Sequence, residues 1–508
     1  MRRTRYRLRR TVAVTALLAA TLGGTLAAGP AGAAAPGTTA LASTPLPPAL
    51  EAVRAAEATA LYGSPEERPP AARRSGLISL GDSEISGEGV GAYEPGTNGP
   101  DNWCHRSPDA AVHRTGIPAD VTYNVSCSGA STANVVIGGT PQYADELVQS
   151  DSLAIKARNT RIKMIVLVVG ANDELQFGPV MTDCVVRYLT LQGPCAAGYA
   201  PGWQARVDAL VPRVEQSVRD LRTVMTDAGY ATGDYRLVVM GYPSPIGPDF
   251  RDNPQFSTKI ACGGLGYDSD TAWGRDTAVP AFERGIRRAA AATGAVYLDN
   301  SRLFHGHEVC TDSTWARGLF IDLTKPGLPD ENSVRQSFHP NARGHAAFAS
   351  CLTQLWATTA REASCADPAS TGTPVLRAGA WDDVFVPLTH PATGACLDVP
   401  GSVTRNGTVP TGWTCHDGRN QDWWYDTGTR TLRTALSHDR CLDVPGAAYN
   451  SGEQLVLWNC SGAANQRFVR QGGTLRPEAA TGLCATLASA TAPLVLRACD
   501  GSAAQRFA

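Results

Sequence analysis

An apolar run that stops at a polar turn decides the fold: Gly76-Leu77-Ile78-Ser79-Leu80-Gly81-Asp82-Ser83. Three later runs, at residues 164–169, 236–240 and 295–298, also stop at polar or glycine-containing turns. Unbroken aliphatic and β-branched runs are typical of strands buried on both faces of a parallel sheet. We therefore expect these four segments to be neighbouring parallel strands.

Amphipathic patterns lie between these runs. Apolar residues recur at helical spacing from Val207 to Val224 and from Val279 to Ala289, and a third helix is expected over 342–360. Alternating strands and helices predict an α/β fold with helices on both faces of a parallel sheet, over residues 75–365. Ligands of such folds bind at the carboxyl ends of the strands, where the polar turns lie.

Length and charge narrow the class of protein. A chain of 508 residues is long enough for two or three domains. The formal net charge is −2, and no basic stripe follows the first ten residues. We therefore expect no binding to nucleic acid.

The N-terminus has the pattern of a targeting segment. Arginines without any acid occupy residues 1–10, a mildly apolar stretch covers 11–28, and Ala31-Gly32-Ala33 follows. This pattern predicts a signal peptide over 1–33, with a retained membrane anchor as the alternative. We expect a secreted, extracellular protein without a stable membrane anchor. Residues 34–74, rich in Ala and Pro, predict a pro-region or linker in which 50–61 could form a short helix.

Four short blocks carry the chemistry: Gly81-Asp82-Ser83, Cys127-Ser128-Gly129-Ala130, Gly170-Ala171-Asn172-Asp173 and His339-Pro340. In this order they resemble the GDSL/SGNH family of ester hydrolases, the lipases and esterases, over residues 75–365. The resemblance implies a three-layer α/β/α SGNH hydrolase fold. It also implies Ser83 as nucleophile, His339 as general base, and an oxyanion hole formed with Gly129 and Asn172. No Gly-x-Ser-x-Gly elbow occurs in the chain, which argues against an ordinary α/β-hydrolase.

The chemistry explains why these residue types are needed. A hydroxyl is a poor nucleophile near neutral pH, so an imidazole within hydrogen-bond reach must take its proton. Attack on an ester creates an oxyanion, which the amides of Ser83 and Gly129 and the side chain of Asn172 could stabilise. No cofactor and no metal are required.

One position departs from the family pattern. Many members carry Asp three residues before the histidine, and this chain carries Gln336 there. The resemblance implies that a main-chain carbonyl, of Gln336 or of Ser337, can orient the ring and leave a Ser–His dyad. Asp330 and Glu331 remain alternative orienting groups. His345 is the alternative base, although its Gly344-His345-Ala346 setting indicates helix packing.

The cysteines predict structural disulfides because the chain is expected to be exported. In the hydrolase region, sequential nesting suggests the pairs Cys104–Cys127, Cys184–Cys195 and Cys262–Cys310, with Cys351 and Cys365 left over. Spacing alone does not fix this connectivity. The cluster His305-Gly306-His307-Glu308 could suggest a metal, but it lacks the His-x-x-x-His spacing, so no metal site is expected.

The C-terminal third, residues 375–508 after a linker over 366–374, is a repeat. Its three units begin at Cys396, Cys441 and Cys484, which lie 441 − 396 = 45 and 484 − 441 = 43 residues apart. A period near 40 also occurs in propellers and solenoids. Three units that each close with Gln-x-aromatic indicate a pseudo-threefold β-trefoil instead, and they resemble the ricin-type lectin module. The resemblance implies one disulfide in each unit: Cys396–Cys415, Cys441–Cys460 and Cys484–Cys499.

The lectin resemblance also implies carbohydrate sites, in which an aromatic ring stacks on the sugar and a carboxylate and an amide bind its hydroxyls. The first unit supplies Asp398, Trp413, Asn420 and Gln421, and the second supplies Asp443, Trp458, Asn465 and Gln466. The third unit has Thr486, Arg497 and Ala504 at the carboxylate, ring and amide positions, so two sites are expected. The alternative for Gln421 and Gln466 is a structural role in the core.

Together these patterns predict a monomeric, secreted carboxylic-ester hydrolase that a lectin module holds at glycan surfaces. Its substrate would be an acyl ester: a lipid, a phospholipid or an acetylated polysaccharide. The alternatives are a polysaccharide acetyl esterase and a catalytically degenerate carbohydrate-binding protein. Thioesterase or peptidase activity on the same dyad is a further alternative.

Overall fold

The computed structural model describes residues 43–248, 262–321 and 331–508. The predicted signal peptide, 1–33, and the first part of the predicted pro-region lie outside the described residues.

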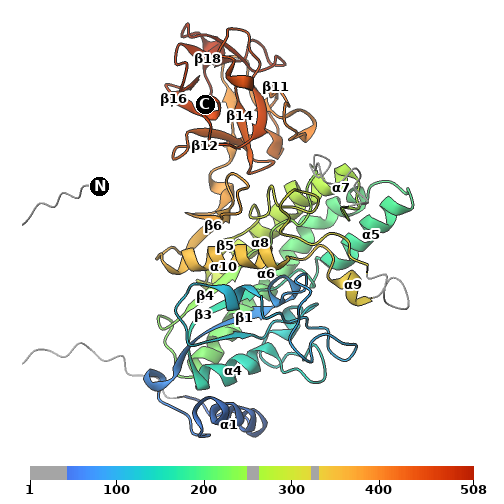
Figure 1. Ribbon diagram of the computed structural model, residues 1–508, viewed down its shortest axis with the longest axis vertical. Helices are drawn as coiled ribbons and strands as arrows, with labels where there is room; N and C mark the ends of the chain where they lie inside the picture. The colour runs from blue at the N-terminus through green and yellow to red at the C-terminus, as the bar shows by residue number, and fades with distance from the viewer. Residues whose placement is uncertain (1–42, 249–261, 322–330) are drawn as a thin grey trace, which may run out of the picture. The chain divides into compact units, whose positions relative to one another are not determined.

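A seven-stranded sheet in the order β2-β1-β3-β4-β5-β6-β7 forms the centre of the first domain (Figure 1). The neighbouring strands run parallel, except that β7 runs antiparallel to β6. The strands are β1 (Arg74–Gly81), β2 (Val121–Asn124), β3 (Thr160–Val168), β4 (Arg236–Met240), β5 (Val296–Asp299), β6 (Glu362–Ala366) and β7 (Val375–Ala378). The predicted α/β class with a mainly parallel sheet is confirmed.

The helices form two groups against this sheet. Helices α4 (Gln149–Asn159), α6 (Ala196–Asp227) and α8 (Val279–Thr293) pack side by side, while α3 (Ala111–Arg114) packs against α10 (Ala342–Trp356). Consecutive residues of β1 and β3 are buried, as they must be when both faces of a sheet are covered. The sheet and its helices therefore form the expected layers.

The segment before β1 is more ordered than a linker. Helix α1 (Pro48–Tyr62) covers the short helix expected over 50–61 and packs against α4. Its buried Arg54 donates to Oδ1 of Asn159 at 3.2 Å, and Nδ2 of Asn159 donates back to the Arg54 carbonyl at 2.9 Å. The described part of the predicted pro-region is thus packed onto the sheet domain.

The sheet also includes residues that the sequence placed in the trefoil. Residues 375–378 form β7, which pairs with β6 through the register Ala363↔Ala378 to Ala366↔Val375. Residues 367–374 of the predicted linker connect these two strands of one sheet.

The C-terminal region repeats one hairpin three times: β10 (Ala395–Asp398) with β11 (Thr411–Thr414), β14 (Arg440–Asp443) with β15 (Val456–Asn459), and β18 (Leu483–Thr486) with β19 (Val495–Ala498). The closing aromatic residues of the three units, Trp423, Phe468 and Phe507, are buried in a common core. The pseudo-threefold repeat thus converges on one hydrophobic centre, as the trefoil prediction requires.

Seven disulfides bridge the described part of the chain. Those of the sheet domain are Cys104–Cys127, Cys184–Cys195, Cys262–Cys310 and Cys351–Cys365. Those of the trefoil are Cys396–Cys415, Cys441–Cys460 and Cys484–Cys499, one for each unit. The six suggested pairs are present, and the two leftover cysteines form the seventh.

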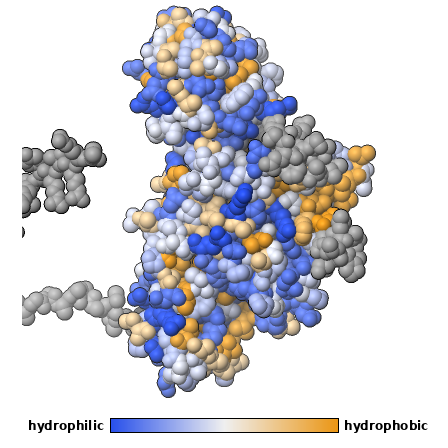
Figure 2. Space-filling view, viewed as in Figure 1, coloured by the Kyte–Doolittle hydropathy of each residue, from blue (hydrophilic) through white to orange (hydrophobic). Residues whose placement is uncertain are grey.

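Figure 2 shows hydrophilic residues over much of the visible face and a hydrophobic patch over α5 (Phe177–Leu189). Exposed aliphatic side chains of this region include Val186, Leu189 and Leu191. No helix in the described ranges is long and apolar enough to cross a membrane.

Candidate active site

Ser83 lies where β1 ends, as the first residue of the short helix α2 (Ser83–Ser86). The preceding Asp82 caps this helix, since its Oδ1 accepts from the amide of Glu84 at 3.0 Å. Its other oxygen accepts from the hydroxyl of Tyr242 at 2.6 Å, and burial raises the pKa of Asp82 to about 7. Gly81 approaches β3 so closely that a Cβ there would lie 1.7 Å from the Val168 carbonyl oxygen. The turn thus holds Ser83 in one place.

His339 meets this serine across 256 residues of sequence. Its Nε2 lies 2.9 Å from Oγ of Ser83, and its Nδ1 lies 2.9 Å from the carbonyl oxygen of Ser337. A carbonyl oxygen can only accept, so Nδ1 carries the proton and Nε2 can accept from the serine hydroxyl. Burial lowers the pKa of His339, which keeps the ring neutral near neutral pH. A neutral imidazole in this tautomer can act as a general base.

The structure distinguishes between the groups considered for orienting His339. The Ser337 carbonyl lies 2.9 Å from Nδ1 of His339, whereas the side chain of Gln336 bonds to Arg317 and, at 2.9 Å, to Oδ1 of Asn332. Asp330 and the side chain of Glu331 lie outside the described residues.

His345, the alternative base, is buried within α10. Its Nδ1 accepts from the amide of Ala111 on α3 at 3.3 Å, and burial lowers its pKa to about 3. A ring that is fully buried between two helices has a packing role, in agreement with the sequence interpretation.

The loop that follows β2 brings Gly129 toward the nucleophile. The amide of Cys127 donates to the carbonyl of Gly81 at 3.0 Å, beside the end of β1. Gly129 has φ +80°, in the left-handed region that favours glycine. Within the described ranges, the amides of Ser83 and Gly129 have no hydrogen-bond partner. Both amides are thus available to an acceptor atom.

Asn172 follows β3, the strand next to β1 in the sheet. Its Nδ2 donates to the carbonyl of Ala130 at 2.9 Å, and this bond uses one of the two N–H groups of the amide. The neighbouring Asp173 accepts from the hydroxyl of Thr132 at 2.6 Å and from its amide at 3.1 Å. Asp173 therefore ties the Asn172 turn to the Gly129 loop, a role that the sequence motif alone did not reveal.

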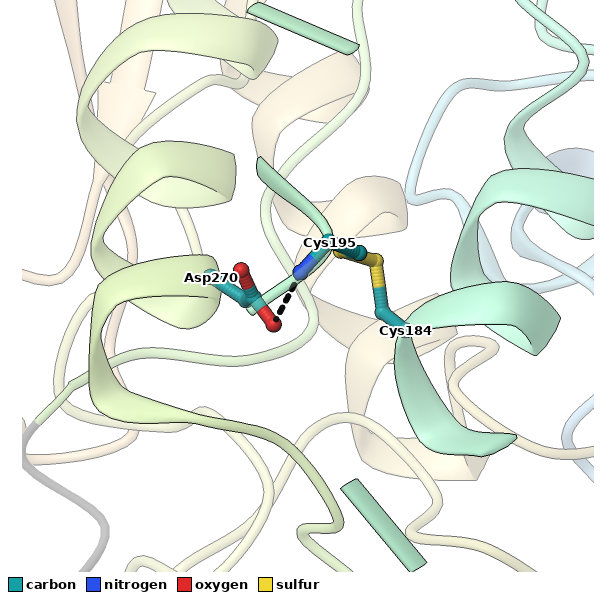
Figure 3. Close-up of side chains that lie close together, drawn as sticks. All are labelled: Cys184, Cys195 and Asp270. Atoms are coloured by element: carbon teal, nitrogen blue, oxygen red, sulfur yellow. Dashed lines mark hydrogen bonds between the residues drawn. A yellow bond between two sulfur atoms is a disulfide. The ribbon is translucent and has the colours of Figure 1, made fainter. Parts of the chain in front are cut away.

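A cluster of Cys184, Cys195 and Asp270 has the residue types of a metal site, but its chemistry is different (Figure 3). The two sulfurs are joined in a disulfide, so neither is available as a thiolate. The Asp270 carboxylate accepts from the backbone amides of Cys195 at 3.1 Å and Ala196 at 2.9 Å. This acid therefore caps the start of α6.

In the histidine cluster, His307 and Glu308 likewise make hydrogen bonds to other protein groups. His307 uses Nδ1 on the Ser313 carbonyl at 2.7 Å and Nε2 on the buried Asp367 at 2.8 Å. Glu308 accepts from the amide of Gly306 at 2.7 Å. These side chains hold the local loop together.

The first trefoil unit places a buried carboxylate beside an exposed ring. Oδ2 of Asp398 accepts from Asn420 at 2.7 Å and from Gln421 at 2.9 Å. Trp413, on the partner strand, is 54% exposed. His416 Nε2 lies 3.7 Å from the same carboxylate oxygen. The arrangement offers a stacking face next to a fixed acceptor.

The second unit repeats this arrangement. Asp443 accepts from Asn465 at 2.9 Å and from Gln466 at 2.8 Å, and Trp458 is 45% exposed. In both units the glutamine is fully buried, and its amide also bonds to the main chain, as in the 2.8 Å bond from Gln466 to the Asn459 carbonyl. Gln421 and Gln466 therefore hold the carboxylates in place and do not face solvent.

The third unit keeps only the buried glutamine of this arrangement, Gln505. Gln505 donates to the Ala498 carbonyl at 2.8 Å, while Thr486 hydrogen-bonds to the main chain of Cys484 at 3.0 Å. The ring position is occupied by Arg497 and the amide position by Ala504. This unit offers neither a carboxylate nor an aromatic face.

Comparisons with known proteins identify two families along the chain. The GDSL-like Lipase/Acylhydrolase family matches residues 79–347, and the ricin-type beta-trefoil lectin domain matches residues 384–507. A lipase of Streptomyces rimosus is 26% identical over 295 residues, which cover 56% of this chain and 89% of that protein.

Two solved structures are also similar. Phospholipase A1 from Streptomyces albidoflavus NA297 is 24% identical with a TM-score of 0.38, over 56% of this chain and 100% of that one. The designed 3-fold symmetric protein ThreeFoil is 25% identical with a TM-score of 0.22, over 24% of this chain and 95% of that one. On the two family matches, the chain belongs to the GDSL-like lipase/acylhydrolase family and carries a C-terminal ricin-type β-trefoil lectin domain.

Proposed function

We propose that this protein is a secreted carboxylic-ester hydrolase that acts through a Ser83–His339 dyad. The observation that carries the proposal is the pair of 2.9 Å contacts of His339, one to Oγ of Ser83 and one to the carbonyl of Ser337. These contacts give the imidazole the tautomer and the direction that a general base for Ser83 requires.

Acylation begins when Nε2 of His339 takes the hydroxyl proton of Ser83 as Oγ attacks the ester carbonyl carbon. The carbonyl π electrons move to oxygen and form a tetrahedral oxyanion. The amides of Ser83 and Gly129, which have no partner within the described residues, and the second N–H of Asn172 supply donors for this charge, and one such donor is worth about 3 kcal/mol. His339 then returns the proton to the leaving alcohol as the ester C–O bond breaks.

Deacylation reverses these roles. Water gives a proton to Nε2 of His339 as its oxygen attacks the acyl carbon, and the second oxyanion uses the same donors. Collapse of this intermediate breaks the bond to Oγ, and the histidine returns the proton to Ser83. Ser337 supports the ring throughout, although a carbonyl supplies no full negative charge to the imidazolium that forms in each step.

The trefoil supports a substrate at a carbohydrate surface. Two units combine an exposed tryptophan with a buried, oriented aspartate, which is a chemistry suited to stacking on a sugar and binding its hydroxyls. Weak sites of this kind raise the local concentration of enzyme where several sugars are presented. This feature favours, as a second candidate, an esterase that removes acetyl groups from polysaccharides.

Hydrolysis of p-nitrophenyl acetate, butyrate and palmitate by the purified chain tests the proposal. We expect Ser83→Ala and His339→Ala each to lower kcat/KM by about 10³-fold or more. Ser217→Ala removes a buried serine of α6 that bonds only to the main chain of its own helix, and should retain wild-type activity. Wild-type activity in Ser83→Ala would refute the dyad.

The chain-length profile separates the substrate classes. Preference for palmitate indicates a lipase, and preference for acetate indicates an acetyl esterase. If all three esters are inert, release of acetate from acetylated xylan decides between an enzyme restricted to polysaccharides and a carbohydrate-binding protein without activity.

A further inference from the structure

A buried acid–imidazole pair lies in the loops beside the candidate dyad. The side chains of Glu88 and His105 are both 0% exposed, and Oε1 of Glu88 lies 2.7 Å from Nδ1 of His105. On the other side of the ring, Nε2 lies 3.1 Å from Oδ1 of Asn98. Both ring nitrogens thus face oxygen atoms, one of a carboxylate and one of a side-chain amide. The pair is fully buried, and hydrogen bonds hold the imidazole ring on both sides.

The carboxylate belongs to a segment in direct contact with the main chain of His339. Gly89 follows Glu88, and a Cβ on Gly89 would lie 2.6 Å from the carbonyl oxygens of both His339 and Pro340. Only glycine permits this approach. The second carboxylate oxygen of Glu88 has no hydrogen-bond partner among the residues that the structure describes.

A hydrogen-bonded chain connects the same pair to the position of the missing acid. Oδ1 of Asn98 accepts from Nδ2 of Asn332 at 2.9 Å, and Oδ1 of Asn332 accepts from Nε2 of Gln336 at 2.9 Å. Gln336 stands three residues before His339, where many family members carry Asp. The buried pair is therefore attached to the loop that presents the base and lacks this acid.

We propose that Glu88, held in place by His105, is a positioning residue that supplies the fixed negative charge beside His339. This inference rests on the proposed function of the dyad. Each catalytic cycle turns His339 into an imidazolium twice, and a nearby anion lowers the free energy of that state without touching the substrate. The charge comes from the loop after the nucleophile, whereas the usual acid lies on the loop of the histidine.

The electrostatics support this role. Burial is the largest influence on the pKa of His339 and lowers it, and the charge of Glu88 is the next largest and raises it. The opposing influence of His105 is smaller than that of Glu88. The carboxylate thus partly offsets the burial of the base.

Three other titratable or charged side chains lie in this region: Tyr93, Arg317 and His345. Tyr93 stacks on His105 with 4.3 Å between ring centroids, and its hydroxyl donates to the Glu88 carbonyl. The backbone amide of Arg317 donates to the His339 carbonyl at 2.9 Å. His345 is a buried residue of helix α10. None of these groups is removed by a substitution at Glu88.

Glu88→Gln tests the proposal because it removes the charge and keeps a hydrogen-bond acceptor for His105. We expect kcat/KM on p-nitrophenyl butyrate to fall by about 3- to 10-fold on the pH plateau, with KM little changed. The acid limb of the pH profile should move to lower pH, because the pKa of His339 falls when the anion is lost. Glu88→Asp keeps the charge on a shorter side chain. The acid limb of this variant should therefore lie between those of the wild type and Glu88→Gln.

Asp367→Asn is the matched control, since it disrupts a second buried acid–imidazole pair, with His307, and Asp367 is not among the main influences on the pKa of His339. Its acid limb should coincide with that of the wild type. An unmoved limb in Glu88→Gln, or an equal movement in Asp367→Asn, would overturn the inference. Should Glu88→Gln fail to fold by circular dichroism, an unmoved limb in Glu88→Asp overturns it. If Ser83→Ala stays active, the dyad itself is wrong; if Ser83→Ala is inactive and the limb is unmoved, only this inference fails.

Discussion

The carbonyl oxygen of Ser337 lies 2.9 Å from Nδ1 of His339, a contact made by the main chain two residues before the histidine. A main-chain acceptor can set the tautomer and orientation of the imidazole as a side-chain acid does, but it carries no net charge. Because the contact belongs to the backbone, side-chain substitutions at this position should leave it intact.

Ser337→Ala should therefore be nearly silent in catalysis. The hydroxyl of Ser337 accepts from the amide of Phe320 at 2.9 Å, whereas the contact to the imidazole is made by the Ser337 carbonyl. We expect kcat/KM within about threefold of wild type and a loss of about 1 kcal/mol in the free energy of unfolding. Steady-state assays with p-nitrophenyl butyrate and urea unfolding measure the two effects. A loss as large as that of His339→Ala would mean that the side chain, and not the carbonyl, orients the base.

Asn172→Ala should lower kcat by about 10²- to 10³-fold while KM changes little. The amide is expected to donate more strongly to the oxyanion than to the ground-state ester, so its removal affects the transition state. Asn172→Asp should be at least as damaging, because a carboxylate would repel the oxyanion. Steady-state kinetics on p-nitrophenyl butyrate decide the matter. An active Asn172→Asp enzyme, or a loss confined to KM, would contradict the oxyanion role.

Asp82→Asn should raise the free energy of unfolding relative to the wild type, and the difference should be largest near neutral pH. The pKa of Asp82 is raised to about 7 in the folded state by burial, against 3.8 as its ordinary value. The raised value contributes stability that is fully present below the ordinary pKa and is lost as pH rises through the folded one. The free energy of unfolding of wild type should fall relative to the variant by up to about 4 kcal/mol between about pH 4 and about pH 7. Urea unfolding of both proteins across this range measures the difference, and a pH-independent gap would contradict the burial argument.

Asp398→Ala and Asp443→Ala should weaken retention on polysaccharide and leave hydrolysis of soluble esters unchanged. Each carboxylate is held by an asparagine and a glutamine next to an exposed tryptophan. If both sites bind at once, the double variant should lose more retention than the two single variants predict together. Pull-down on insoluble xylan, chitin and galactan measures this, with Thr486→Ala as the control in the third unit. Equal retention by the double variant and wild type would exclude these sites.

The strands and helices with strong periodicity could be predicted from the sequence, and the weaker ones could not. The run at 76–81 became β1, and the stripe from Val207 to Val224 lies in α6. Strand β6 begins with Glu362 and has no long aliphatic run, and β7 adds only Val375 and Leu376 as aliphatic residues. Their strand state depends on pairing with neighbouring strands, β6 with β5 and β7 and β7 with β6, which local pattern does not report.

The same division applies to the candidate site. Four motifs of the family resemblance predicted Ser83, Gly129, Asn172 and His339, and those of Ser83, Asn172 and His339 also stand next to a strand end or helix start that the pattern marks. The choice of the Ser337 carbonyl depends on the path of a loop, and local composition does not define that path. The Glu88–His105 pair has no motif, and His105 adopts φ +47°, which is uncommon for residues other than glycine and cannot be read from the local sequence.

The third trefoil unit shows that folding and ligand binding use different residues of the same repeat. It has no carboxylate, indole or asparagine at its outer positions, yet it keeps Gln505, Phe507 and the Cys484–Cys499 bond that complete the core. A unit of this design can change its outer residues at little cost to the stability of the whole module. Gene duplication followed by independent drift of each unit can therefore retune valency, from three binding faces to two or one, while the scaffold persists.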